Sequence, residues 1–282
     1  MTIPKYQTTL LVVLMAAGVF SGCASLPGTA LSSATASGMD CTVTGAGAPV
    51  VVFESGIGET LNTWDKVFPE VARLTTVFAY TRRGYSGSGP APRETDGETA
   101  VRELRALLAD RHLRPPYVLV GHSLGGLYVE LFAKLHPDEV AGVVLVDPTP
   151  VDHMDRLHAE FPGKYAMLRT IMTLQAESIA MAEQRGIDAT SRAWHAAGPF
   201  PACPMIVLTG VKASLLEDAA MIDYKVRTHA ELLPQWPGAE GRRVESGHFI
   251  QRDKPEAVIA AIRDLLKTIP AKQPALTPQE SR

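Results

Sequence analysis

A serine between glycines provides the strongest chemical signal in this sequence. Ser123 lies in the run Gly-His-Ser-Leu-Gly-Gly, residues 121–126, after an apolar segment at 117–120 and before a helical pattern at 127–135. A Gly-x-Ser-x-Gly turn between strand and helix holds its serine in a strained conformation and exposes the hydroxyl above the sheet. The N-terminus of the following helix adds partial positive charge. These features predict that Ser123 is a nucleophile.

A serine nucleophile needs a base and an acid that orients the base. His248 is the candidate base because it follows the last predicted strand and a glycine. Asp147 is the favoured acid because it ends an apolar strand and would lie at the sheet edge where the serine emerges. The order Ser, Asp, His is the one expected for this architecture. Glu217 and Asp218 stay open as alternative acids, although the residues before them do not resemble a short loop that would bring a carboxylate to that edge.

Two backbone N–H groups would stabilise the oxyanion that forms during acyl transfer. We expect one donor to be the N–H of Leu124, the residue after the nucleophile. The second should be the N–H of Ile57, in the glycine-containing loop after the apolar run at 50–54. Glycines in such a loop let the backbone approach the substrate oxygen.

Short apolar runs alternate with helical patterns through the middle of the chain. The predicted strands are 41–44, 50–54, 75–80, 117–120, 140–146, 204–208 and 242–244, and the predicted helices include 98–109, 127–135 and 255–266. Apolar strands separated by helices indicate an α/β fold, with a mostly parallel sheet that helices cover on both faces.

The stretch 151–197 breaks this alternation, because it is far longer than a simple crossover helix. Its pieces near 152–160, 164–185 and 188–197 have helical character. We interpret the region of about 149–200 as an inserted helical cap over the strand ends.

These motifs together resemble the α/β-hydrolase fold family over roughly 40–268. The segments that carry the resemblance are ESGIGETLNTW (54–64), YTRRGYSGSG (80–89), GHSLGG (121–126), VLVDP (144–148) and SGHFIQRDKPEAV (246–258). Many relatives have His-Gly in the oxyanion loop, where this chain has Ser55 and Gly56. Since the oxyanion is held by main-chain donors, this difference need not disable the site.

The resemblance implies a serine hydrolase with a Ser-His-acid triad and with no metal and no organic cofactor. Its substrate would be a small or medium acyl compound, most simply a carboxylic ester, cleaved through an acyl-enzyme intermediate. Lipase, thioesterase, amidase, C–C hydrolase and perhydrolase activities use the same triad and stay open. A non-catalytic binding lipoprotein is the alternative from another functional class.

The first 22 residues are typical of a bacterial export signal. Lys5 supplies positive charge, and the apolar run 10–20 is too short to span a bilayer, which needs roughly 20 helical residues. Ser-Gly-Cys at 21–23 resembles the bacterial lipobox, with Phe20 where leucine is usual. We therefore predict cleavage before Cys23 and a diacylglycerol on its thiol.

The predicted domain organisation follows from these segments. The signal peptide 1–22 precedes a Ser-, Ala- and Gly-rich flexible tether at 23–38, a folded domain at 39–269 and a Pro-containing disordered tail at 270–282. By resemblance to bacterial lipoproteins, Ala24 after the lipidated cysteine indicates a periplasmic protein anchored in the outer membrane.

Composition excludes several other classes of protein. Of the 282 residues, 46% are hydrophobic, which is enough to build a core and excludes a wholly disordered chain. The formal net charge is −3 and no basic block is present, which argues against tight nucleic-acid binding. Cys41 and Cys203 are predicted near opposite sheet edges, too far apart for a disulfide. The expected partners are a small acyl substrate and, through the lipid, a membrane.

Overall fold

The structure is a computed structural model that describes residues 38–214 and 217–269. The predicted signal peptide with its lipidation site, all but the last residue of the predicted tether, and the predicted tail lie outside these residues. Within the described ranges, none of the helices is long and apolar enough to cross a bilayer.

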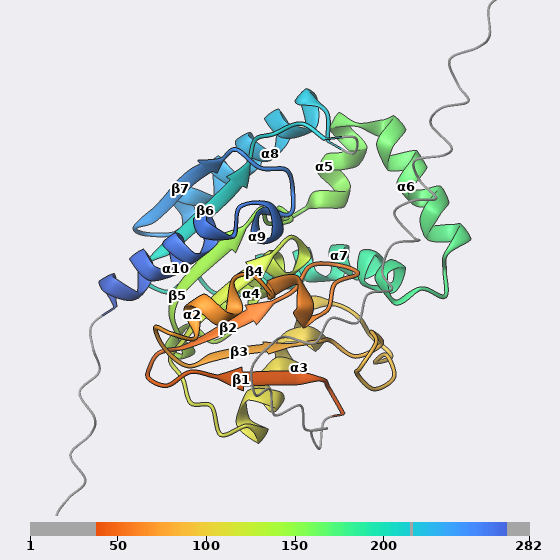
Figure 1. The fold of residues 1–282 in the computed structure, drawn as a ribbon. Helices are drawn as coiled ribbons and strands as arrows, with labels where there is room; N and C mark the ends of the chain where they lie inside the picture. The colour runs from red at the N-terminus through yellow and green to blue at the C-terminus, as the bar shows by residue number, and fades with distance from the viewer. Residues whose placement is uncertain (1–37, 215–216, 270–282) are drawn as a thin grey trace, which may run out of the picture.

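Seven strands of the described chain form one sheet (Figure 1). They are β1 Cys41–Thr44, β2 Val50–Glu54, β3 Val77–Tyr80, β4 Tyr117–His122, β5 Val140–Val146, β6 Met205–Gly210 and β7 Ala239–Val244. The strand order is β1-β3-β2-β4-β5-β6-β7. Strand β1 pairs antiparallel with β3, and every other neighbouring pair is parallel. The carboxyl ends of the parallel strands therefore share one edge, as the sequence predicts.

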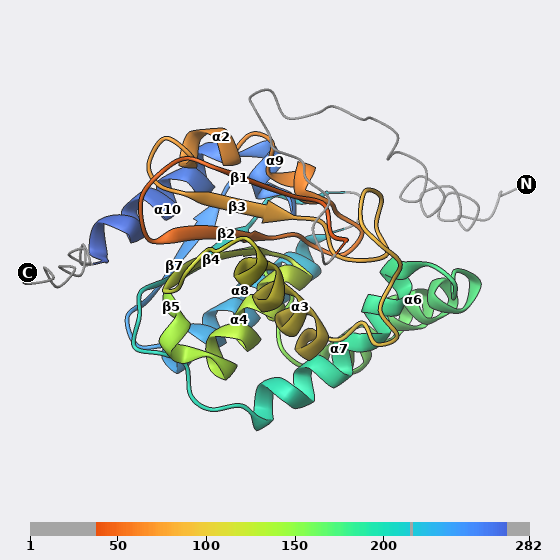
Figure 2. The same cartoon turned by 90° about the horizontal axis from the view of Figure 1, so that it is seen from below.

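Helices cover both faces of the sheet (Figure 2). The α-helices are α2 Phe68–Val71, α3 Gly97–Asp110, α4 Leu124–Leu135, α5 His153–Glu160, α6 Pro162–Leu174, α7 Ile179–Ala196, α8 Ala219–Leu232, α9 Ile250–Asp253 and α10 Pro255–Thr268, and the 3-10 helices are η1 Leu61–Trp64, η2 Pro137–Glu139 and η3 Leu233–Gln235. Helices α3, α4 and α8 cover one face, and α2 and α10 cover the other.

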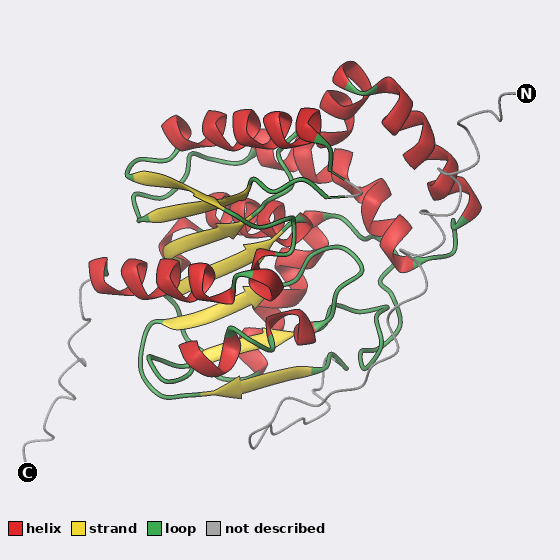
Figure 3. Ribbon diagram, turned by 45° about the horizontal axis from the view of Figure 1, so that its top comes forward, coloured by secondary structure: helices red, strands yellow, loops and turns green. Residues whose placement is uncertain are grey.

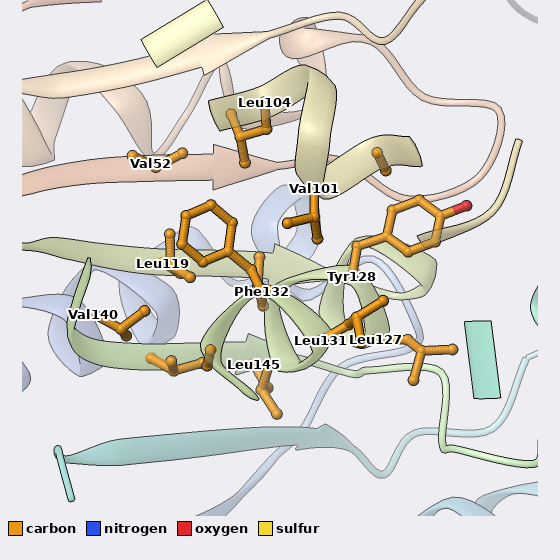
Figure 4. Close-up of a cluster of buried hydrophobic side chains, with 14 of the residues drawn as sticks. Val52, Val101, Leu104, Leu119, Leu127, Tyr128, Leu131, Phe132, Val140 and Leu145 are labelled. Atoms are coloured by element: carbon orange, nitrogen blue, oxygen red, sulfur yellow. The ribbon is translucent and has the colours of Figure 1, made fainter. Parts of the chain in front are cut away.

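Alternating side chains of the strands supply a hydrophobic core on each face. In β2, Val52 packs with the α3 and α4 side chains, whereas Val51 and Phe53 pack with α2 and α10. Figure 4 shows the first of these clusters, in which Leu119 and Phe132 meet between sheet and helix. Full burial of each such side chain stabilises the fold by about 1.5–3 kcal/mol. Because both faces are buried, these strands are continuous runs of valine and leucine rather than alternating patterns.

The predicted cap region contains helices α5, α6 and α7, which lie beyond the carboxyl ends of the strands (Figure 3). The predicted interruption between 185 and 188 is wrong, because α7 runs through it without a break. Gly186 does not end the helix there. A Cβ at this position would lie 2.5 Å from the carbonyl oxygen of Thr95, so glycine lets α7 approach that backbone closely. The real break comes earlier, at 175–178.

Other elements also differ from the predicted ones. Strand β7 begins three residues earlier than predicted, and α8 was not predicted. Its N-cap is Asp218, whose side chain accepts a hydrogen bond from the N–H of Met221. Cys41 and Cys203 are free cysteines in this structure.

Candidate active site

Ser123 occupies the sharp turn between β4 and α4. Its backbone has φ +52° and ψ −122°, a region that L-residues rarely adopt and that costs of order 1–3 kcal/mol. The turn depends on missing side chains, because a Cβ on Gly121 would lie 2.5 Å from the carbonyl oxygen of Gly125. A Cβ on Gly125 would lie equally close to the carbonyl of Glu54. The glycines of the motif thus let β4, α4 and the β2 loop meet around the serine.

Asp147 and His248 form a direct pair at the same sheet edge. Asp147 follows β5 with φ +46° and is buried. Its Oδ2 accepts a hydrogen bond from His248 Nδ1 at 2.7 Å, and its Oδ1 accepts one from the N–H of Gly210 at 2.9 Å. With Nδ1 directed to the carboxylate, Nε2 is the ring nitrogen left to take part in proton transfer.

The two groups change each other's proton affinity. Burial alone would raise the pKa of Asp147, but the hydrogen bond from His248 and the positive charges around the carboxylate outweigh it and hold this pKa well below its usual range. Burial alone would lower the pKa of His248, but the hydrogen bond to Asp147 outweighs burial and raises it. The pair therefore favours an ionised carboxylate beside a histidine of increased basicity.

The loop after β2 is held in place from both sides of its backbone. The N–H of Gly56 donates to Glu59 Oε2 at 2.9 Å, and the N–H of Gly58 donates to the Tyr85 hydroxyl at 2.9 Å. The carbonyl of Gly56 accepts from Arg82 Nη2 at 2.8 Å. This carbonyl belongs to the same trans peptide as the Ile57 N–H, so that N–H points away from the guanidinium.

Ser55 in this loop has a structural role. Ser55 Oγ donates to the carbonyl of Thr60 and accepts from Trp64 Nε1, each at 3.2 Å. Trp64 is fully buried, so its indole N–H needs this partner.

Arg82 connects the loop to the cap. Its guanidinium makes five hydrogen bonds: two to Glu183, one to Glu54, and one each to the carbonyls of Ser55 and Gly56. Glu183 belongs to α7, whereas Glu54 ends β2. Because all the N–H donors of a guanidinium are used, Arg82 is a structural ion-pair partner rather than an anion-binding group.

His122, beside the serine, belongs to a second buried network. Its Nδ1 lies 2.6 Å from Glu59 Oε2, and its Nε2 lies 3.1 Å from the carbonyl oxygen of His248. Burial would raise the pKa of Glu59, but the charge and hydrogen bond of His122 outweigh it and lower this pKa to about 2. His122 thus supports the backbone of His248 from behind.

A cavity of about 840 Å³ brings the predicted site residues together. Ser123, Asp147 and His248 line it, and so do Ile57 and Leu124. Its apolar wall includes residues from α5, α7, α8 and the loop before α9, namely Leu157, Ile187, Met221, Tyr224 and Phe249.

Glu217, one of the two alternative acids, and Lys225, which the sequence analysis did not single out, also line this cavity. Although the residues before Glu217 do not resemble a short loop, the segment after β6 does bring this alternative acid to the cavity. Lys225 Nζ donates to Asp147 Oδ2 at 2.7 Å and to Glu217 Oε2 at 3.0 Å. The other alternative acid, Asp218, is exposed, caps α8 and pairs with Lys164 at 2.9 Å. Lys225 could not be found from the sequence, because the helix that carries it, α8, was not predicted.

Three side chains of this cluster are of types that can bind a metal ion. Ligand atoms of Asp147, Glu217 and His248 lie within 4.8 Å of one another. The ammonium group of Lys225 already bridges the two carboxylates, so a cation position between them is filled by the protein itself. We assign no metal site to this cluster.

Comparison with known proteins identifies the fold. A family model described as alpha/beta hydrolase fold matches residues 49–172. Esterase Rv0045c of Mycobacterium tuberculosis is 26% identical over 260 residues, covering 79% of this chain and 85% of that protein. The uncharacterized protein YqjL of Bacillus subtilis is 32% identical over 104 residues, which span 37% of this chain and 41% of YqjL.

A solved structure agrees with these relatives. A thermophilic esterase from Thermogutta terrifontis superposes with a TM-score of 0.55 at 22% identity, covering 81% of this chain and 93% of that one. The predicted α/β-hydrolase fold is confirmed. The fold and the esterase relative support a hydrolase.

Proposed function

We propose that this protein is a serine hydrolase that cleaves carboxylic esters through Ser123, His248 and Asp147. The observation that carries the proposal is the Asp147–His248 hydrogen bond of 2.7 Å at the cavity that Ser123 also lines. The positive φ of Ser123 supports it, because this strain is typical of a nucleophile turn. Similarity to an esterase over 79% of the chain supports the choice of ester.

In the proposed mechanism, Ser123 Oγ attacks the ester carbonyl while His248 Nε2 accepts the hydroxyl proton. The N–H groups of Ile57 and Leu124 stabilise the developing oxyanion. His248 then gives its proton to the departing alcohol, and an acyl-enzyme is left on Ser123. Water, activated by the same imidazole, releases the acid. Asp147 holds the histidine in orientation and stabilises its cationic form.

The cavity supports a small or medium acyl group. Its volume of about 840 Å³ is within the range of small-molecule sites, and its wall is mostly apolar. Lipase, thioesterase, amidase, C–C hydrolase and perhydrolase reactions use the same three residues, and they are the second candidates for this cavity.

The test is hydrolysis of p-nitrophenyl esters from acetate to palmitate by the wild type, by Ser123→Ala and by Ser86→Ala. Ser86 is exposed and outside the cavity, so it is the matched control. We expect Ser123→Ala to lower kcat on the order of 10⁴–10⁶-fold and Ser86→Ala to leave it unchanged. A fluorophosphonate should add to the wild type and the control only. A folded wild type that neither turns over any ester nor takes the probe would favour the binding-lipoprotein alternative.

A further inference from the structure

The Asp147–His248 pair continues into a chain of charged groups. Lys225 lies on α8 with only 8% of its side chain exposed. Its ammonium donates to the same Asp147 Oδ2 that binds His248, and it also pairs with Glu217 at 2.9 Å. Glu217, Lys225 and Asp147 therefore alternate in charge along the chain of contacts that leads to His248.

We propose that Lys225 is a positioning residue for the reaction and that Lys225 and Glu217 together set the pH at which His248 acts as a base. This inference rests on the proposed function, since it assigns that base to His248. Lys225 does not touch the reacting atoms; it acts through the carboxylate.

Burial makes such a cation necessary. Asp147 is 1% exposed, and a buried carboxylate without compensating charge would take up a proton. The N–H of Gly210 satisfies Oδ1, so the Oδ2 atom depends on His248 and Lys225. When His248 is neutral, Lys225 is the only full positive charge bonded to Asp147 among the described residues. It thereby keeps the carboxylate ionised and directed at Nδ1 before the reaction begins.

The two outer groups act on His248 with opposite signs. The positive charge of Lys225 disfavours the imidazolium and lowers the pKa of His248, whereas the negative charge of Glu217 raises it. Because these two effects oppose each other, Asp147 has the larger influence on the pKa of His248. Neither effect is expected of a residue that only fills space.

Other titratable groups near His248 do not supply this control. Burial lowers the pKa of His153 on α5 to about 4, so it is neutral in the working range. His229 on α8 lies between Thr209 Oγ1 and the carbonyl of Pro148, and burial lowers its pKa as well. On β4, His122 is held by Glu59 and contacts only the backbone carbonyl of His248 among its polar partners. Asp253 lines the same cavity without contacting Asp147 or Lys225 through any hydrogen bond of the structure.

The experiment compares the wild type, Lys225→Met, Glu217→Gln, the double variant, and Lys267→Met. Lys267 is an exposed residue of α10, paired with Asp264, and is the matched control for loss of a lysine charge. Two quantities are measured: the pH dependence of kcat/KM, and the titration of the His248 ring by NMR of histidine-labelled protein. The His248 resonance is assigned by its absence in His248→Gln.

We expect opposite shifts in the two single variants. Lys225→Met should raise the pKa of His248, and the acidic limb of kcat/KM with it, by about one pH unit. Glu217→Gln should lower the pKa of His248 and the midpoint of the acidic limb. In the double variant, both values should lie closer to those of the wild type. Lys267→Met should leave both in place. Shifts of the same sign in the two single variants, or no shift in either, would overturn the proposal.

Loss of folding and failure of the proposed function are recognised separately. Lys225→Arg retains the charge, so it should restore the wild-type limb if Lys225→Met fails to fold. The NMR titration needs no substrate. If the enzyme is active and the pKa of His248 does not shift in the variants, only the role of Lys225 is refuted. If the pKa shifts but the protein shows no serine-dependent turnover, the proposed hydrolase function is refuted.

Discussion

At the scale of single residues, the site is defined by how each polar atom is satisfied. Asp147 uses both oxygens, one for the N–H of Gly210 and one for His248 and Lys225. Arg82 uses its guanidinium donors for Glu54, Glu183 and two loop carbonyls. Because these buried groups have partners, their side chains are fixed before substrate arrives, which is the condition for electrostatic preorganisation.

The pH dependence of activity belongs to this scale. Burial opposes protonation of His248, but Asp147 outweighs burial and raises its pKa above the ordinary value of about 6.5. A base must be neutral in the free enzyme, so kcat/KM should fall tenfold per pH unit below a midpoint higher than about 6.5. Initial rates on p-nitrophenyl acetate from about pH 5 to about pH 9 measure it. A midpoint near about 4 would instead indicate a carboxylate base.

At the scale of elements, the site is made by the loops that follow parallel strands. The β2 loop supplies Ile57, the β4–α4 turn supplies Ser123, and the loops after β5 and β7 supply Asp147 and His248. Closeness of these loops depends on glycine. A Cβ on Gly56 would lie 2.7 Å from Glu59 Oε2 and 3.2 Å from Ser123 Cβ, so this loop and the turn leave no space for a methyl group.

Gly56→Ala should therefore displace the loop that carries the Ile57 N–H. Because one oxyanion donor contributes about 10²–10³-fold to kcat in comparable sites, we expect a loss of that order. Gly163→Ala in α6 is the matched control, since a Cβ there meets nothing within 4 Å. The measurement is kcat of both variants in steady-state kinetics with one ester. Equal kcat in the two variants would contradict the assignment of Ile57.

At the scale of the whole molecule, the cap is joined to the sheet domain by buried polar contacts. Arg82 binds Glu183 of α7, and the N–H of Gly97 donates to Thr190 of the same helix at 2.8 Å. Trp194 Nε1 donates to Glu130 of α4 at 3.0 Å. These contacts hold α7 against the domain, and α7 in turn forms part of the cavity wall.

Glu130 makes this attachment sensitive to pH. Burial raises its pKa to about 8, above an unfolded value near 4.3. The folded state therefore holds the proton more tightly, and stability should decline as pH rises from about 4.3 to about 8. At pH ~4.5, Glu130→Gln should have the melting temperature of the wild type. At pH ~8.5, its melting temperature should be higher than that of the wild type by at least about 2–4 °C. The control is Glu256→Gln, because Glu256 is exposed. A higher wild-type melting temperature at the alkaline end would contradict the shift.

Lipid attachment at Cys23 is also a prediction about the whole molecule, and it concerns residues outside the described ranges. We propose that the mature protein carries a diacylglycerol on this thiol and is anchored in the outer membrane. Intact-mass spectrometry and membrane fractionation of protein made in a Gram-negative host test it, with Cys23→Ala as the control. Wild-type protein that is soluble and has the unmodified mass would refute the anchor.

Much of this fold and part of its site followed from the sequence alone. Continuous valine-rich runs such as 140–146 predicted buried parallel strands, and the glycines around Ser123 predicted the turn, because in both cases the signal is local. The identity of His248 and Asp147 as candidates came from their positions after strands. These are properties of short segments, which their own residues determine.

The tertiary structure was needed to find the contacts between distant residues that no local motif marks. Glu217 lies 94 residues beyond Ser123 in the chain. No sequence pattern near Glu217 predicts that Lys225 on α8 contacts Asp147. Likewise, Arg82 and Glu183 pair across 101 residues. Such contacts depend on how α7 and α8 pack against the sheet domain, and no periodicity or spacing in the sequence specifies this packing. The sequence therefore predicted the candidate residues Ser123, Asp147 and His248. The charged groups that affect their pKa values come together only in the tertiary structure.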